Sequence, residues 1–180
     1  MLDTSNSYSF LSKFFHWARA ILLLIVFILA LNMENFRNLL AWHIAFASIL
    51  FLIVICNILW RLFNVYPKST AVNILEKNIQ FVVYFGIYLL LLIIPIMGYL
   101  SLSYSVNILG IEIKPLYSFE FFNNLILDNT YLDNATVLAS IIKWVHIAFA
   151  WFLVFLIAMH IIAGIVINIK TKGIEFKRMM

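Results

Sequence analysis

The sequence predicts an all-α membrane protein, an antiparallel four-helix transmembrane bundle in a single domain that covers residues 1–180. The chain is 65% hydrophobic and 11% charged, whereas soluble domains are roughly half apolar and about a quarter charged. Its mean hydropathy is +1.04. Four apolar runs each reach the roughly 20 residues that a helix needs to cross a bilayer. These predicted spans are 14–33, 39–60, 79–102 and 137–169.

Three of the runs have a feature that bears on their assignment. The first resembles a signal peptide in position, but no small-residue cleavage site follows it, and cleavage there would remove His16. We therefore expect a retained span. The third contains Pro95, which is expected to kink its helix. The fourth is longer than a bilayer requires, so its first turns are expected to stand above the membrane.

The basic residues predict that both termini are cytoplasmic, because cytoplasmic loops of membrane proteins are enriched in lysine and arginine. With that orientation, nine basic residues fall inside and three fall outside. The inner ones are Lys13, Arg19, Arg61, Lys68, Lys77, Lys170, Lys172, Lys177 and Arg178, and the outer ones are Arg37, Lys114 and Lys143. The net charge of +4 is therefore no sign of nucleic-acid binding.

The outer loop 103–136 is acidic and aromatic. Its segment "PLYSFEFF" (Pro115–Phe122) suits a position along the membrane interface or over the end of the bundle. A partly ordered loop is the alternative interpretation. The single cysteine, Cys56, lies inside an apolar run and excludes an internal disulfide.

The four histidines sort into two pairs by depth. Two of them begin the same phrase, "HIAFA", at His43 and at His146. His146 and His160 are 14 residues apart, so on one helix they point the same way and lie about 21 Å apart along its axis. If His16 is placed at the depth of His160, on the inner side, the first span runs from about Lys13 to Met33, again roughly 20 residues. If His43 is placed at the depth of His146, on the outer side, the second span ends near Trp60, with Arg61 just inside the cytoplasm.

Two imidazoles that face each other inside a helical bundle can hold a haem iron from both sides. The alanines of "HIAFA" would let the macrocycle approach, and the phenylalanine would pack against it. We therefore predict two haems, one held by His16 and His160 and one by His43 and His146. Basic residues near these levels are candidate partners for the haem propionates, with simple snorkelling as the alternative. They are Arg19, Arg61 and Lys143.

Other interpretations are weaker. A closed zinc site would need more ligands, because Glu34 is the only carboxylate close in sequence to a histidine and Cys56 lies mid-span. The small residues of "HIAFA" also suit ordinary helix packing. A non-redox protein such as a small transporter remains open, but the sequence shows no inverted repeat with broken helices.

Several segments together resemble the bacterial cytochrome b561 family of small dihaem membrane proteins. The similarity extends over nearly the whole chain. The matching segments are "FHW" (Phe15–Trp17), "WHIAFASILFLIVICNILWRL" (Trp42–Leu62), "YLLLLIIPIMG" (Tyr88–Gly98), "KWVHIAFAWFLVFLIAMH" (Lys143–His160) and "FKRMM" (Phe176–Met180). The segment Lys143–His160 contains two histidines, His146 and His160, at the spacing of the two haem ligands on the family's fourth span.

This resemblance implies an electron-transfer protein of the bacterial cytoplasmic (inner) membrane with two haem b groups. The inner haem would be held by His16 and His160, and the outer one by His43 and His146. One branch of the family is a superoxide oxidase that passes electrons from superoxide at the outer face to ubiquinone, so a respiratory oxidoreductase is expected. The alternative is a haem-bearing membrane anchor that relays electrons for a separate dehydrogenase or hydrogenase, its redox partner subunit.

The chain departs from the family pattern at two positions. Tyr84 stands where many members carry a third-span histidine, and Val145 separates a tryptophan and a histidine that are adjacent in relatives. The four ligands are intact, so haem binding is still expected. The resemblance therefore implies no quinone contact or proton route through a third-span histidine in this chain. The acidic outer loop is also a poor attractant for anionic superoxide.

Overall fold

The computed structural model describes residues 3–4, 7–33, 36, 38–64, 74–102, 104–115, 130–173 and 177, with the backbone alone for 130–136. Apart from Pro115, the predicted interface segment lies outside the described residues. So do Glu34, Arg37, Lys68, Arg178 and most of the segment 176–180.

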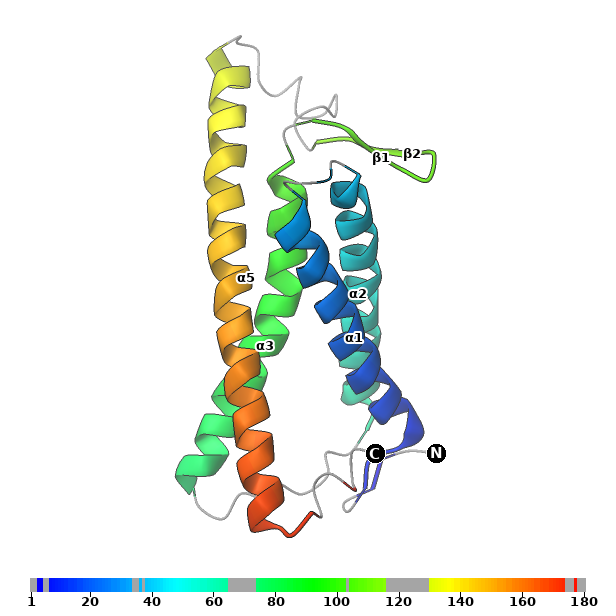
Figure 1. Ribbon diagram of the computed structural model, residues 1–180, viewed down its shortest axis with the longest axis vertical. Coiled ribbons are helices and arrows are strands. Elements are labelled where there is room, and N and C mark those ends of the chain that lie inside the picture. Colours follow the sequence, from blue (N-terminus) through cyan, green and yellow to red (C-terminus); the bar gives the residue numbers. More distant parts are fainter. Residues whose placement is uncertain are drawn as a thin grey trace.

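Four helices form the body of the described chain (Figure 1). They are α1 (Phe10–Asn32), α2 (Leu39–Leu62), α3 (Ile74–Leu100) and α5 (Thr130–Lys170). All are long and apolar enough to cross a membrane, α5 over Val137–Lys170. The predicted all-α class and its four spans are therefore confirmed. Most helices extend beyond the predicted spans, since backbone hydrogen bonding continues past the residues that a bilayer must cover.

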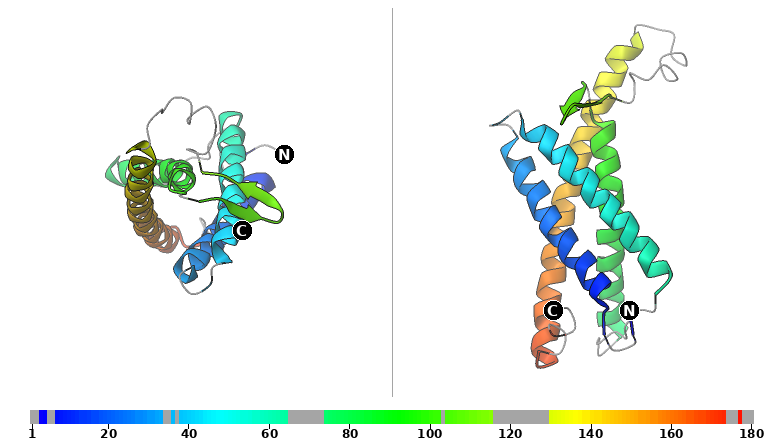
Figure 2. Two further views of the ribbon diagram at one scale, coloured as in Figure 1. Left: turned by 90° about the horizontal axis from the view of Figure 1, so that it is seen from above. Right: turned by 90° about the vertical axis from the view of Figure 1, so that its right-hand side faces the viewer.

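The helices pack as two antiparallel pairs, α1 with α2 and α3 with α5, and α2 also contacts α3 (Figures 1 and 2). The start of α1 and the end of α5 lie at one end of the bundle, here called the termini end. The opposite end, where α1 ends and α2 begins, is called the far end. A short connection between α1 and α2 makes them neighbours.

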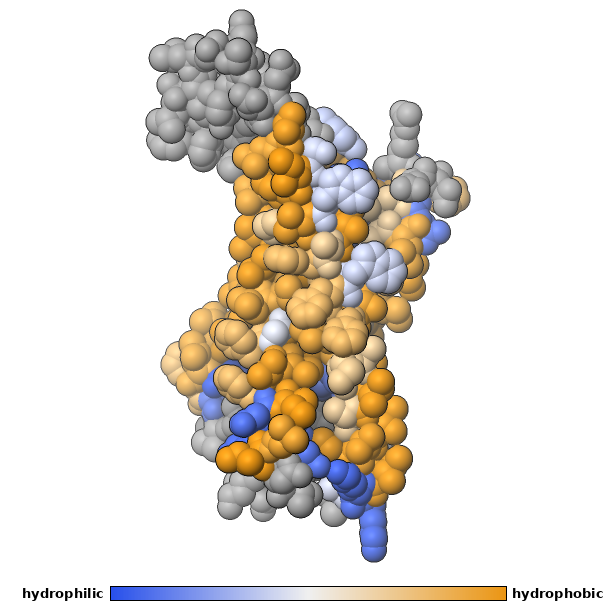
Figure 3. All heavy atoms as spheres, turned by 90° about the vertical axis from the view of Figure 1, so that its left-hand side faces the viewer, coloured by the Kyte–Doolittle hydropathy of each residue, from blue (hydrophilic) through white to orange (hydrophobic). Residues whose placement is uncertain are grey.

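The centre of the bundle is a small aliphatic core from α2, α3 and α5. Its buried members are Leu50, Val54, Leu90, Leu91, Leu153 and Leu156. At Gly86 a Cβ atom would lie only 2.9 Å from Leu156 Cδ1, so glycine permits the close approach of α3 to α5. Large apolar side chains cover much of the outer surface (Figure 3), as expected where lipid replaces water.

A β-hairpin at the far end was not predicted from the sequence. Strand β1 (Val106–Ile108) pairs antiparallel with β2 (Ile111–Ile113). Leu109 and Gly110 connect the strands with φ angles of 51° and 88°, as in the two-residue turns that suit hairpin twist. The backbone N–H of Gly110 also donates to Asn107 Oδ1 at 2.9 Å.

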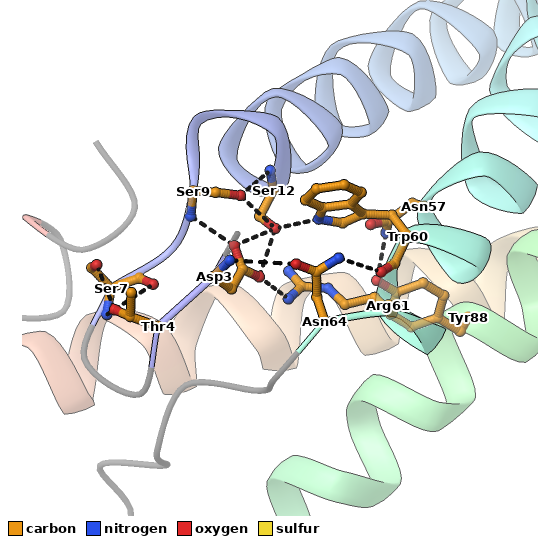
Figure 4. A network of polar contacts seen from close by, with 10 residues as sticks. All are labelled: Asp3, Thr4, Ser7, Ser9, Ser12, Asn57, Trp60, Arg61, Asn64 and Tyr88. Carbon is orange, nitrogen blue, oxygen red and sulfur yellow. Dashed lines mark hydrogen bonds and ion pairs between the residues drawn. The ribbon is translucent and has the colours of Figure 1, made fainter. Parts of the chain in front are cut away.

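The chain start is tied to α1 and α2 by polar contacts at the termini end (Figure 4). Asp3, whose side chain is fully buried, accepts from Ser9 N at 2.7 Å and pairs with Arg61 Nη1 at 2.8 Å. The Ser12 hydroxyl donates to Asp3 and accepts from Trp60 Nε1 at 2.9 Å. Ser9 also caps the start of α1 by accepting from Ser12 N.

Candidate functional site

The four histidines face one another in two pairs between the helix pairs of the bundle. His16 of α1 faces His160 of α5, with ring centroids 6.3 Å apart. His43 of α2 faces His146 of α5, with centroids 6.5 Å apart. All four side chains are partly buried. The structure thus groups the rings by depth in the same two pairs as the sequence, one toward the termini end and one toward the far end.

The spacing within each pair leaves room for one metal ion between the rings. A metal–imidazole bond is about 2 Å long and the ring centre lies about 1 Å behind the nitrogen, so two rings on opposite sides of one metal have centroids about 6 Å apart. The observed 6.3 and 6.5 Å agree with this value. Each pair therefore fits the axial ligand set of a haem, whose porphyrin supplies the other four ligands.

Backbone carbonyls orient the rings of the far-end pair. His43 Nδ1 lies 3.0 Å from Val26 O, and His146 Nδ1 lies 3.0 Å from Ile94 O. A carbonyl can only accept, so each Nδ1 carries the proton and each Nε2 keeps a lone pair. This second hydrogen bond is the one that metal-binding histidines usually make.

Helix α3 approaches His146 closely because it has a glycine at that point. A Cβ atom on Gly98 would lie 3.1 Å from His146 Cε1, tighter than an ordinary contact. Pro95 lies one turn earlier and cannot donate within the helix, which leaves the Leu91 carbonyl without its usual partner. The segment from Ile94 to Gly98 thus forms the wall of α3 against this ring.

Tyr84 of α3 lies beside the termini-end pair. Its ring makes an edge contact with His160, with the centroids 5.3 Å apart. The third span contains no histidine, and none of its residues was among the predicted ligands or propionate contacts. The structure places a polar aromatic side chain of this span directly against a candidate ligand. The position that departs from the expected family pattern therefore lies against the termini-end pair.

Arg19 is held beside the termini-end pair by neutral groups. Its Nε donates to the Phe15 carbonyl at 3.0 Å, and its guanidinium lies 4.9 Å from the centre of the Tyr88 ring. In the amide orientation that satisfies all partners, Asn57 Oδ1 accepts from both Arg19 terminal nitrogens at 3.1 Å and from the Tyr88 hydroxyl at 2.7 Å. The charge of Arg19 is close enough to act on both His16 and His160.

The other two cations predicted to meet propionates have different surroundings. Arg61 pairs with the buried carboxylate of Asp3 and lies 5.4 Å from the centre of the Tyr8 ring. Lys143 is exposed, one turn before His146 on α5. Arg19 and Arg61 thus already have protein partners, whereas Lys143 extends from the surface near the far-end pair. Contact of any of the three with a propionate stays a prediction.

Sequence reasoning missed the polar residues that hold these cations. Asn57 is fully buried in α2 and Tyr88 faces it from α3. A polar amide inside an apolar span is a functional candidate by default, so Asn57 could have been found from the sequence. Tyr88 follows Tyr84 by four residues and therefore shares its helix face. Asp3 gave no such signal, because its partner is 58 positions away.

The histidines of the described part of the chain meet in pairs. Among the described residues, no group of three or more histidine, cysteine, aspartate or glutamate side chains is close enough to hold one ion. A structural zinc site takes four protein ligands, whereas a haem needs only one or two. The donor set fits the haem better.

Comparison with known proteins agrees with this geometry. The family model described as prokaryotic cytochrome b561 matches residues 7–180. The chain belongs to this family. No curated protein and no solved structure gave a match. The resemblance seen in the sequence is thereby confirmed, and with it the coarse function. This prokaryotic cytochrome b561 is a multi-pass bacterial membrane protein that carries haem b and transfers electrons.

Proposed function

We propose that this cytochrome b561 holds two haem b groups and transfers single electrons across the membrane. His16 and His160 would ligate the haem near the termini end, and His43 and His146 the one near the far end. The observation that supports this is the pair of ring separations, 6.3 and 6.5 Å, at two levels of one bundle. Along α5 the two levels are 14 residues, or about 21 Å, apart.

The protein's own groups would prepare both sites before haem arrives. Val26 O and Ile94 O hold the protonated Nδ1 of His43 and His146, so that each Nε2 keeps its lone pair for an iron. The aliphatic core between the two levels excludes water and keeps the dielectric constant low. Bound haem would supply the one-electron couple between ferric and ferrous iron. Ligand type, burial and nearby charge are the features through which the protein sets its potential.

For the direction of transfer, we propose superoxide as donor at the outer face and ubiquinone as acceptor. With both termini cytoplasmic, the far end faces outward, and the location is the inner membrane. Two superoxide ions would each lose one electron to become dioxygen, and one ubiquinone would take up the two electrons and two protons to become ubiquinol. At the far end, Lys114 lies 3.9 Å from Glu112 and offsets its charge, and Lys143 is exposed. Lys143 would favour an anionic donor, whereas Lys114 would only reduce the repulsion that Glu112 exerts on it.

An absorption spectrum tests the haem proposal. The purified protein should show dithionite-sensitive bands of low-spin haem b, at two haems per chain. His43→Ala should reduce the content to one haem, and His16→Ala should do the same. The matched control is Trp42→Phe, which changes the neighbour of a candidate ligand and should retain both haems. Absence of a reducible haem from the native chain would contradict the proposal.

Stopped-flow mixing with superoxide tests the donor. Superoxide should reduce the protein within the mixing experiment, and added ubiquinone should then reoxidise it. Superoxide dismutase in a parallel run should abolish the reduction. If the protein binds haem but superoxide does not reduce it, the proposed donor is wrong and the haem proposal is unaffected. If such a protein also retains a dehydrogenase or hydrogenase through purification, the membrane-anchor function would replace the superoxide one.

A further inference from the structure

The far-end hairpin has one apolar and one polar face. Its cross-strand pairs Val106–Ile113 and Ile108–Ile111 are aliphatic. The pair between them, Asn107–Glu112, is polar. Directly opposed residues share a face and successive residues alternate, so the four aliphatic side chains lie together on one side of the hairpin. A two-stranded sheet is only marginally stable alone in water, and this apolar face requires cover.

The described protein covers this apolar face most fully at its base, and Ile108 and Ile113 are half-buried. Val106 is 7% exposed and β1 packs against α2. Ile111, on the same face nearer the turn, is 67% exposed, and Leu109 in the turn is 81% exposed. Since Val106 faces α2, the aliphatic face is directed back toward the bundle end. The polar pair faces the opposite way.

The hairpin also lies at the level where the apolar surface of the bundle ends. It projects sideways past α2, across the helix axes and not along them (Figures 1 and 2). Trp42, in the first turn of α2, and Trp144 of α5 are both exposed near this end. Tryptophans gather at the boundary between the hydrocarbon and the headgroups. The exposed residues of the hairpin and these two tryptophans thus lie at the same end of the bundle.

We propose that residues 106–113 form an interfacial anchor that rests on the lipid headgroup boundary, with its apolar face in the membrane. Ile108, Ile111 and Leu109 then bury their side chains among lipid, while Asn107 and Glu112 remain in water. The bond from the Tyr99 hydroxyl to the Lys114 carbonyl, 3.2 Å long, fixes the end of β2 to α3. Such an anchor sets the depth of the far end in the membrane and does not depend on haem binding.

Single-cysteine labelling tests this inference. Ile111→Cys and Glu112→Cys are adjacent residues on opposite faces, and each is made in a Cys56→Ala background and labelled with the fluorophore NBD. The full chain is placed in nanodiscs of phosphatidylcholine and phosphatidylglycerol. Lipid with a doxyl group near the headgroup should quench the label at position 111 about twofold more than that at 112. Iodide in the buffer should show the reverse order.

A label at Leu24→Cys, in an exposed position on α1, is the reference for contact with lipid. Helical circular dichroism checks that each variant is folded. Equal iodide quenching at positions 111 and 112 would place both faces in water and overturn the inference. A label at 111 shielded from both quenchers would show that protein covers the face, from elsewhere in the chain or from a second copy, and would overturn it too.

Discussion

Arg19 is the residue whose charge matters most for the termini-end pair. Arginine stays protonated in proteins, and each of its described partners is neutral, namely the Phe15 carbonyl, Asn57 and Tyr88. A fixed positive charge beside a haem favours the ferrous over the ferric state, because the ferric centre carries one more positive charge. Arg19 should therefore raise the midpoint potential of the haem held by His16 and His160. The haem at the far end, about 21 Å away, should respond less.

Arg19→Gln should lower the termini-end potential by about 59 mV or more, which corresponds to a tenfold change in the one-electron equilibrium. Redox titration followed by visible spectroscopy measures both haems in one sample. Arg19→Lys retains the charge and should restore most of the difference. Equal shifts at the two haems, or the same shift in the lysine variant, would show that Arg19 acts through packing and not through its charge.

Gly98 determines how closely α3 approaches His146. In Gly98→Ala, the new methyl group would meet the imidazole Cε1 at 3.1 Å, so the ring must move by a few tenths of an ångström. His146 Nδ1 is also bonded to Ile94 O, and this movement strains that bond. Loss of a hydrogen bond to a metal ligand typically lowers the affinity of the site about tenfold or more. The far-end haem of Gly98→Ala should therefore dissociate about tenfold faster.

The measurement is the rate of haem transfer to apomyoglobin, together with the low-spin electron paramagnetic resonance signal. Gly164→Ala is the matched control, because a methyl group there would meet nothing within 4 Å. If Gly98→Ala has an unchanged spectrum and an unchanged rate of haem transfer, the His146 ring moves without any weakening of haem binding, which would contradict the prediction.

At the scale of elements, the chain start holds α1 and α2 together through a charge. Burial opposes ionisation of Asp3, but hydrogen bonds from Ser9 and Ser12 and the charge of Arg61 outweigh it, so the Asp3 pKa is lowered below its ordinary value. A carboxyl whose folded-state pKa is lowered contributes stability above its unfolded pKa. That contribution is lost as the pH falls through the folded pKa.

Asp3→Asn should lower the free energy of unfolding in detergent by about 2 kcal/mol at neutral pH, since it removes a buried partner of Arg61. The difference from the native chain should shrink as the pH falls below about 4, the ordinary pKa of an aspartate in the unfolded chain, and should vanish as the pH falls through the lowered pKa of the folded state. Thermal unfolding followed by circular dichroism at both pH values checks this. Glu112→Gln is the control, because its ion pair is exposed and 3.9 Å long. A pH-independent loss in Asp3→Asn would contradict the electrostatic explanation.

The elements themselves were predictable to different extents. The four helices follow from apolar length alone, because a bilayer leaves a spanning backbone no alternative to internal hydrogen bonds. The hairpin escaped prediction because two three-residue strands give too short a pattern, although the alternation in Val106–Ile108 and Ile111–Ile113 and the turn at Gly110 were present. The Asp3 contacts depend on packing between segments distant in sequence, which no local pattern encodes.

At the scale of the whole molecule, the spacing of the histidines was enough to predict which rings would meet. The rise per residue of an α-helix gives the axial distance between His146 and His160, which are 14 residues apart. Because all four helices cross the same bilayer, a residue's depth can then be compared between helices. Rotation about each helix axis is not encoded in this way. The contacts of Tyr84 with His160 and of Tyr88 with Arg19 therefore appear only in the folded bundle.

Because one helix supplies a ligand to each level, α5 offers a test of whether the two sites are independent. His146→Ala removes a far-end ligand but leaves His16, His160 and the Arg19 contacts intact, and the aliphatic core separates the two levels. The variant should therefore keep about one haem per chain, with the potential of the termini-end site nearly unchanged. His160→Ala should give the reverse result, with one haem of the far-end type.

Pyridine haemochrome content and redox titration of both variants measure this directly. Each should fail to pass electrons from an outer donor to quinone while still containing a reducible haem, because transfer over the full depth needs both levels. Loss of both haems from either variant would show that the sites fold as one unit. Retention of both haems in His146→Ala would show that a different residue ligates the far-end haem.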